Sequence, residues 1–389
     1  MKKGLIIIIL FLIHSVASTQ PFIPGTSYFG RGNYIEYLPG TLPIIITVPH
    51  GGSLTPGEIP DRTCGDETVT DSYTINLARS IQEEITEITG CYPHVIICHL
   101  KRTKLDANRD KDIAACGNEF AETAWNEFHM FIDSAKASVV KKSGKGLLID
   151  LHGHAHPIQR LEIGYLLTGT QLAYSDPLLN SSAYINLSSI RNLIGTNVSG
   201  SKHSELLHGI HSLGSMFAAR GYESVPSIDE PFPFTGEPYF SGGYNTERHG
   251  SVKDGTVDAI QIECNQNVRF EESARNSFAA AAAVVFLDYL IKHYFPNLPQ
   301  TYCKPVGIES PENDGFAIYP VPFTETLSVK SLVPCQISIF DFKGEQIFIK
   351  EIGTEECLDL RHLKSGLYLV TLSEEGKILF RKKVIKGTK

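Results

Sequence analysis

Four segments of the chain place a chemically capable side chain directly after an apolar run. IIITVPHGG at residues 44–52 presents His50, LLIDLHGHAH at 147–156 presents His152, and DAIQIECNQ at 258–266 presents Glu263. HLKRTKLDANRD at 99–110 presents a cluster of basic and acidic groups. Imidazole and carboxylate are side chains that suit a zinc ion, and a catalytic zinc site combines three such ligands with an open fourth position. The residue types therefore predict a catalytic zinc centre.

We expect His50 and His152 to be two of the three ligands. The third ligand should come from the acidic loop at residues 51–71. Asp71 is preferred because it is expected at the N-terminus of a helix, a fixed point of the fold, and Glu67 is the alternative. The loop offers five carboxylates in all: Glu58, Asp61, Asp66, Glu67 and Asp71.

Glu263 is the candidate general base. Zinc lowers the pKa of bound water to about 7, and a base must lie about 2.6–3.2 Å from the proton that it takes. A buried, paired carboxylate without a catalytic duty is the alternative for Glu263. His154 and His156 follow His152 closely and are either further ligand candidates or merely polar neighbours.

Two further segments carry candidate substrate-binding groups. In RTKLDANRD, residues 102–110, Arg109 could hold a carboxylate through a two-pronged hydrogen bond, and Asp106 could orient an arginine or a metal ligand. In YFSGGYNTERHG, residues 239–250, the glycines allow a close backbone approach, and Arg248 and His249 add polar groups. A solvated surface loop is the alternative for both segments.

An alternation of strands and helices is expected to position these residues. This alternation predicts an α/β domain with a mixed, largely parallel sheet, in which sites form beyond the carboxyl ends of the strands. Strands are expected at residues 43–49, 94–100, 147–151, 163–168 and 258–263, and helices at 71–89, 117–141 and 272–293.

The two ends of the chain differ in composition from the part between them. MKKGLIIIILFLIHSVASTQ predicts a signal peptide over residues 1–18, because its apolar core is too short to cross a bilayer. No other segment approaches 18 apolar residues, so no membrane span is expected. Residues 298–315 are rich in Pro, Gly and polar residues and predict a linker. The short alternating segments of residues 316–389 predict a small all-β sandwich.

Composition adds two expectations. The net charge of −8 and the pI near 6.0 argue against a nucleic-acid partner, which calls for a basic surface. Eight cysteines occur without a C-x-x-C pair, so a thiolate zinc site is not expected. Cys335 and Cys357 stand apart from the others in the C-terminal segment and are the candidate disulfide pair, and free cysteines are the alternative.

The C-terminal segment resembles the type IX secretion C-terminal sorting domain of Bacteroidetes. YPVPFTETLSV is similar to the opening of that domain, with Val321 where the family usually has Asn. IFDFKGEQI and LDLRHLKSGLYLVTL are similar to its two later blocks. The resemblance implies that the type IX secretion machinery is a partner and that the protein is secreted or held at the cell surface.

Residues 40–272 resemble the N-formylglutamate amidohydrolases, which are relatives of the zinc carboxypeptidases. VPHGG, TDSYTINLA, RTKLDANRD and LIDLHGH match family blocks in order, and FSGGYNTERHG and AIQIECNQNVRF resemble two later blocks. The carboxypeptidases have a Glu three residues after the first His, where this chain has Ser53. The segment 169–238 has no counterpart in the family.

The resemblance implies a three-layer α/β/α, zinc carboxypeptidase-like domain over residues 19–297. It implies an enzyme that uses zinc-activated water to cleave an amide bond of a small anionic N-acyl amino acid, peptide or γ-glutamyl compound. A non-catalytic secreted binding protein or an esterase of the same fold is the alternative. The implied roles are metal binding for His50, Asp71 and His152, catalysis for Glu263 with Arg102 or Arg248, and substrate binding for Asn108, Arg109, Gly243 and Tyr244.

Overall fold

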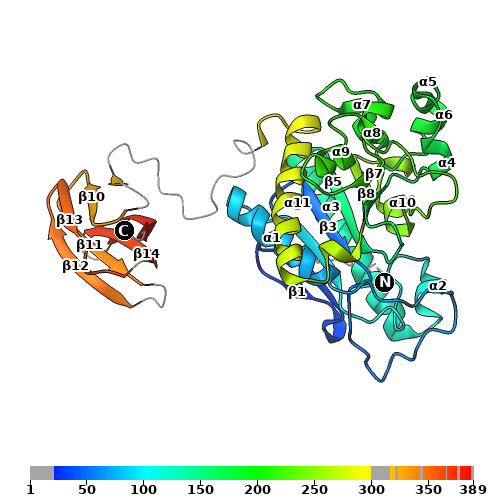
Figure 1. Ribbon diagram of the computed structural model, residues 1–389. Helices are drawn as coiled ribbons and strands as arrows, with labels where there is room; N and C mark the ends of the chain where they lie inside the picture. Colours follow the sequence, from blue (N-terminus) through cyan, green and yellow to red (C-terminus); the bar gives the residue numbers. More distant parts are fainter. Residues whose placement is uncertain are drawn as a thin grey trace, which may run out of the picture. The chain divides into compact units, whose positions relative to one another are not determined.

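The computed structural model describes residues 22–298, 316–319, 323–341, 345–364, 366–374 and 377–386 (Figure 1). The chain divides into two compact units, residues 1–305 and 306–389. The expected signal peptide, residues 1–18, lies outside the described residues, as does almost all of the expected linker, residues 298–315.

The first unit is built on a mixed sheet of eight strands. The strands are β1 (Tyr28–Phe29), β2 (Ile35–Leu38), β3 (Ile44–Val48), β4 (His94–Cys98), β5 (Gly146–Gly153), β6 (Leu161–Gly164), β7 (Ser224–Val225) and β8 (Val257–Cys264). Their order in the sheet is β1-β2-β4-β3-β5-β8-β6-β7. The central strands β4, β3, β5 and β8 run parallel, so their carboxyl ends meet at one edge. β2 and β6 flank them in antiparallel pairings.

Helices cover both faces of this sheet. Ile44, Ile46 and Val48 of β3 pack into one buried cluster with α1 (Thr74–Thr89) and α11 (Glu272–His293). Ile45 points the other way, into a cluster with α3 (Glu119–Ser143). Every residue of β3, β4 and β8 is buried, as expected for strands covered on both sides. The three-layer α/β/α fold predicted from the sequence is confirmed.

Short helices make up most of the remaining first unit. The segment 169–238, which has no counterpart in the resembled family, holds α4 to α9 and the edge strand β7. The short helices are α2 (Lys111–Ala115), α4 (Gly169–Leu172), α5 (Asp176–Leu179), α6 (Ser182–Ile185), α7 (Arg191–Thr196), α8 (His203–His208), α9 (Leu213–Ala218) and α10 (Tyr244–His249). Single 3₁₀ turns occur at Arg31–Asn33, Ser251–Lys253 and Gln266–Val268.

The structure corrects three of the expected elements. α1 begins at Thr74 rather than at residue 71, because Tyr73 before it adopts a left-handed conformation with φ of 67°. β6 ends at Gly164 rather than at 168, and Leu166 beyond it also has a positive φ of 66°. Residues 244–249 of the glycine-rich stretch form a helix, α10, and not a loop.

Among the described residues, α11 is long and apolar enough to cross a membrane, although the sequence led us to expect no such segment. Its run of alanines raises the mean hydropathy to 1.3. Phe278, Phe286 and Leu290 pack in the core of the first unit, and 56% of the apolar stretch is buried there. These contacts are those of a core helix.

The predicted pairing of Cys335 with Cys357 is wrong. The structure pairs Cys64 with Cys116, whose Cα atoms are 5.8 Å apart, and leaves Cys335 and Cys357 unpaired. Cys335 lies buried on β11 (Cys335–Phe340) and Cys357 lies exposed on β13 (Glu355–Asp359), and these two strands belong to different sheets. Their isolation in the sequence therefore did not imply that they meet.

The second unit consists of antiparallel strands in two sheets, as predicted. One sheet has the order β13-β10-β9 and the other β12-β11-β14-β15. Val329, Ile337, Leu358 and Val370 from the two sheets share one buried core. The strands are β9 (Ala317–Tyr319), β10 (Thr326–Lys330), β11 (Cys335–Phe340), β12 (Gln346–Ile352), β13 (Glu355–Asp359), β14 (Gly366–Glu374) and β15 (Lys377–Lys386).

Candidate metal centre

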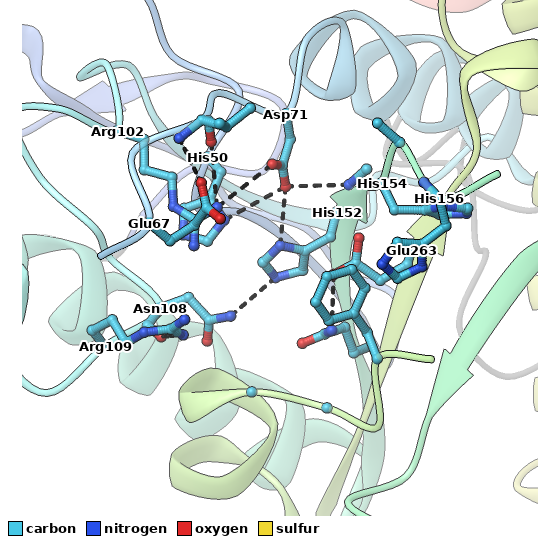
Figure 2. Close-up of a pocket in the computed structure, with 17 residues that line it drawn as sticks. His50, Glu67, Asp71, Arg102, Asn108, Arg109, His152, His154, His156 and Glu263 are labelled. Carbon is cyan, nitrogen blue, oxygen red and sulfur yellow. Dashed lines mark hydrogen bonds and ion pairs between the residues drawn. The ribbon is translucent and has the colours of Figure 1, made fainter. Parts of the chain in front are cut away.

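The parallel strands bring the predicted ligands to one edge of the sheet (Figure 2). His50 follows β3, and His152 lies near the end of β5, which pairs with β3 in parallel. In the next pairing, His152 is directly opposite Glu263 of β8. The backbone that follows His50 passes too close to a neighbouring strand for a residue larger than glycine. A Cβ on Gly52 would lie 2.3 Å from the carbonyl oxygen of His99, so only glycine lets the chain pass the end of β4.

Asp71 completes a three-residue group. Its backbone N–H donates to the carbonyl of His50 over 3.0 Å, which fixes Asp71 beside the histidine three residues before α1 begins. Its Oδ2 atom lies 3.1 Å from Nδ1 of His152 and 3.5 Å from Nδ1 of His50. One ligand atom from each residue lies within 4.8 Å of the others, so the group could hold a metal ion.

The second nitrogen of each imidazole is held by a different carboxylate. Nε2 of His50 donates to Asp106 over 2.6 Å, and Nε2 of His152 donates to Asp150 over 2.9 Å. Carboxylates only accept hydrogen bonds, so both Nε2 atoms carry a proton and both Nδ1 atoms present a lone pair in the neutral ring. Carboxylate–histidine pairs of this kind orient metal-binding imidazoles.

The three facing atoms fit a cation. Nδ1 of His50 is buried and has no hydrogen-bond partner, and it faces the Oδ2 atom of Asp71. Two lone pairs that face each other in a buried site need a proton or a metal ion between them. Ligand atoms about 2.0–2.1 Å from a tetrahedral zinc ion lie roughly 3.3 Å from one another. The separations of 3.1 and 3.5 Å between Asp71 and the imidazoles agree with this spacing.

The charges around the group are strongly coupled. Burial alone would raise the pKa of Asp71, but the neighbouring imidazoles of His152 and His50 hold it well below its usual range. Burial would likewise raise the pKa of Asp106, which His50 and Arg102 hold below its usual range. Burial alone would lower the pKa of His152, but Asp150 and Asp71 raise it well above its ordinary value. The carboxylates thus remain charged and favour a cation among them.

Glu263 differs from these carboxylates. It is only 6% exposed and accepts one hydrogen bond, from Nε2 of Gln261, over 3.0 Å. Burial raises its pKa to about 8; the charge of His152 opposes this shift, and Asp71, Glu162 and Asp150 add to it. A carboxyl group whose pKa lies near neutral pH is suited both to accept a proton and to release it.

The expected substrate-binding residues divide into two groups. Arg109 is exposed, lines the cavity and lies beside Asn108 on the opposite side of His152 from His156 (Figure 2). Asn108 also lines the cavity and in addition links two segments: its Nδ2 lies 3.3 Å from Nε2 of His152, and its Oδ1 accepts from the backbone N–H of Asn245. Gly243 packs against Asn108, because a Cβ there would lie 2.5 Å from Nδ2 of Asn108.

The two arginines proposed for catalysis take different positions. Arg102 is buried, donates to Asp106 over 3.0 Å and lies 3.9 Å from Asp71. The structure does not bring Arg248 to the cavity; its guanidinium lies 5.2 Å from the ring centroid of Trp125. Tyr244 also lies outside the cavity lining, on α10.

The cavity has a volume of about 410 Å³. Glu67, the alternative ligand, lines it, but Oε1 of Glu67 accepts from the backbone of Val69 and Glu67 is not part of the three-residue group. The cavity is lined by His50, Glu67, Val69, Asp71, Arg102, Asn108, Arg109, His152, Gly153, His154, Ala155, His156, Phe240, Gly242, Gly243, Gln261 and Glu263.

Two important residues were not singled out in the sequence. Asp150 is two residues before His152 on the same strand, and this spacing places both side chains on one face, so the signal was present. Arg62 had no such signal. Its guanidinium donates to the backbone carbonyls of Arg102, Cys64 and Ile113, and so ties the loop before Asp71 to α2.

Comparison with known proteins identifies the second unit. Residues 317–386 match the family model of the secretion system C-terminal sorting domain. A domain of this kind implies that the protein engages a secretion machinery and is secreted or located at the cell surface. None of the curated protein sequences matches the chain.

The first unit is similar to several solved structures at low sequence identity. An N-formylglutamate amidohydrolase from Ralstonia eutropha JMP134 matches with a TM-score of 0.40 and 12% identity, over 65% of this chain and 95% of its own. An N-acetylmuramyl-L-alanine amidase from Mycobacterium smegmatis matches with 0.29 and 10%, over 64% and 96%. A succinylglutamate desuccinylase from Chromobacterium violaceum matches with 0.33 and 11%, over 78% of each chain.

Proposed function

We propose that the protein is a secreted, zinc-dependent amidohydrolase that cleaves an amide bond of an N-acyl amino acid, a peptide or a γ-glutamyl compound. One observation carries this proposal. Two buried imidazoles turn their Nδ1 atoms toward one oxygen of Asp71, while a carboxylate holds each opposite nitrogen. This set of donors is that of a catalytic zinc site with three protein ligands.

In the proposed reaction His50, Asp71 and His152 hold the zinc ion. When bound, zinc lowers the pKa of a water molecule to about 7 and polarises a carbonyl group. Glu263, directly opposite His152 in the sheet, accepts a proton from the attacking water and returns it to the departing nitrogen. The C–N bond breaks, the acyl carbon gains the water oxygen, and an amine and a carboxylate are released.

Arg109 is proposed to anchor the substrate. It is an exposed arginine that lines the cavity, and its planar guanidinium suits a carboxylate partner. Arg102 has a different proposed role. It lies among Asp106, Asp71 and the backbone of Val69, where it can neutralise charge near the reacting carbonyl.

The proposed export route uses both a signal peptide and the sorting domain. The sorting domain, residues 316–389, would direct the chain to the type IX secretion machinery after the signal peptide, residues 1–18, has taken it across the inner membrane. Export also favours the observed disulfide, because disulfides persist in oxidising compartments.

The test is release of an amine from a panel of N-acyl amino acids, peptides and γ-glutamyl compounds by the purified, zinc-loaded protein. We expect chelator to abolish the release and added zinc to restore it. The Glu263→Gln variant should bind one equivalent of zinc and lose nearly all turnover. Turnover that resists chelator would rule out a metal-dependent hydrolase, and full activity in Glu263→Gln would remove this residue from the mechanism.

A further inference from the structure

The cavity has an aromatic wall to which the proposed reaction gives no role. The rings of His156 and Phe240 stack with centroids 4.7 Å apart and an angle of 14° between their planes. Both residues line the cavity, and Phe240 remains 43% exposed. A large apolar ring that is left open at a cavity provides a surface for a ligand.

A buried carboxylate fixes both members of this wall. Glu162 on β6 has no exposed surface, and its Oε1 accepts from Nδ1 of His156 over 2.7 Å. Its Oε2 accepts from the backbone N–H of Phe240, also over 2.7 Å. Burial of a carboxylate is unfavourable unless it is hydrogen-bonded, so the position of Glu162 and those of the two rings depend on one another.

The segment that carries Phe240 is hydrogen-bonded to β6 and to the residues just after it. The hydroxyl of Tyr239 donates to the carbonyl of Ile163 over 2.7 Å, and the N–H of Leu166 donates to the carbonyl of Ser241 over 2.6 Å. The wall is therefore formed before any ligand binds. A preformed surface loses little conformational entropy on binding, which favours affinity.

The wall lies on the opposite side of the candidate metal centre from Arg109. Glu162 is directly opposite Glu263 in the pairing of β6 with β8, and Glu263 is directly opposite His152 in the pairing of β8 with β5. Figure 2 shows Arg109 on one side of His152 and His156 on the other. A substrate whose anionic end meets Arg109 thus extends its far end over the wall.

We propose that Phe240 and His156 form the subsite for the acyl group of the substrate and that this subsite selects an acyl group carrying a flat ring. The inference rests on the proposed function, in which the amino-acid carboxylate binds Arg109 and the amide lies at the metal centre. Stacking on Phe240 then favours an aromatic acyl group over a small aliphatic one. Nε2 of His156 is free to accept a hydrogen bond, because Nδ1 carries the proton toward Glu162.

The test compares kcat/KM for N-benzoyl-, N-cyclohexanecarbonyl- and N-acetylglutamate. We expect N-benzoylglutamate to exceed N-acetylglutamate by about tenfold or more, with the cyclohexane compound between them. The Phe240→Leu variant should reduce the benzoyl-to-acetyl ratio about fivefold, and Phe240→Tyr should retain it. Phe29→Leu, which removes an exposed ring on the edge strand β1, is the matched control and should change nothing.

A second measurement separates this inference from the proposed function. Calorimetry with the metal-free protein gives the affinities for the same three compounds without turnover. If no amide is cleaved but N-benzoylglutamate binds best and Phe240→Leu removes the preference, the amidohydrolase proposal fails and the subsite stands. If rates and affinities are alike for benzoyl and acetyl, or the cyclohexane compound equals the benzoyl one, the ring-selective subsite is overturned while the hydrolase proposal stands.

Discussion

Two groups of histidines and a carboxylate lie side by side in this protein, and they differ in how their ring nitrogens are hydrogen-bonded. His50, Asp71 and His152 form the first group, and His154, His156 and Glu162 form the second. Both have the ligand types that zinc prefers and atoms within 4.8 Å of one another. The difference lies in what the ring nitrogens already bind.

In the second group the protein itself binds both ring nitrogens of His154 and one ring nitrogen of His156. Nε2 of His154 donates to the carbonyl of Arg160 over 2.9 Å, and Nδ1 of His154 accepts from the N–H of His156 over 3.1 Å. Nδ1 of His156 donates to Glu162. In the first group Nδ1 of His50 is buried and has no hydrogen-bond partner. A ligand set is therefore recognised by its unsatisfied atoms as much as by its residue types.

The largest effect on zinc binding is expected when a ligand of the first group is removed. His152→Ala should weaken zinc binding by more than the roughly 100-fold that loss of an outer partner causes, because it removes a ligand. His156→Ala, the matched change in the second group, should leave one equivalent of zinc bound. Elemental analysis after dialysis measures both. A second equivalent of zinc in the unaltered protein, lost in His156→Ala, would show that the two groups are alike.

The carboxylates that accept hydrogen bonds from the histidines allow a second comparison of the two groups. Asp150→Asn and Asp106→Asn should each weaken zinc binding about 10- to 100-fold, because an amide no longer fixes the protonated nitrogen of its histidine. Glu162→Gln in the second group should leave the zinc affinity unchanged. Competition with a chromogenic chelator gives the affinities. Equal losses in all three variants would indicate a general disturbance rather than orientation of ligands.

The disulfide lies in the part of the chain that leads to the first group. Cys64–Cys116 closes a loop between positions 52 residues apart, and the same region carries Arg62 and leads to Asp71. The Cys64→Ser and Cys116→Ser double variant should lose about 4 kcal/mol of unfolding free energy by the loop-entropy estimate and bind zinc several-fold more weakly. Denaturant titration and chelator competition are the measurements. Cys357→Ser, at an exposed unpaired cysteine, is the control.

The smallest effect on zinc is expected at a histidine with a purely structural role. Nδ1 of His94 accepts from the N–H of Gly40 over 3.0 Å and lies 2.9 Å from the hydroxyl of Tyr37, and burial lowers its pKa to about 3. Because the folded pKa lies below the unfolded value of about 6.5, His94 stabilises the fold fully above pH 6.5. This stabilisation is lost as the pH falls from 6.5 toward 3, by about 1.4 kcal/mol per unit.

The His94→Gln variant tests this pH dependence. Its unfolding free energy, measured by urea titration at several pH values, should fall less steeply below pH 6.5 than that of the unaltered protein. Zinc affinity at neutral pH should not change. The same slope in both proteins would show that His94 does not account for the acid sensitivity.

Much of the fold was predictable because its signals are local. Buried parallel strands are continuous apolar runs, and the predicted bounds of β3, β4, β5 and β8 differ from the observed ones by no more than two residues. The alternating segments after residue 316 likewise gave the β-strands of the sorting domain. β1 and β7 were not predicted, because a strand of two residues is too short to show an alternation of apolar and polar residues.

The sequence by itself determined which residue types stand at the carboxyl ends of the central strands, because strand length and period are properties of a few neighbouring residues. Only the tertiary structure decided which nitrogen of each histidine is free. It also placed Asp71 by a backbone bond to His50 rather than by a helix start, and it turned Arg248 toward Trp125. The partner of His50, Asp106, comes from a segment 56 residues away, so its choice depends on long-range packing.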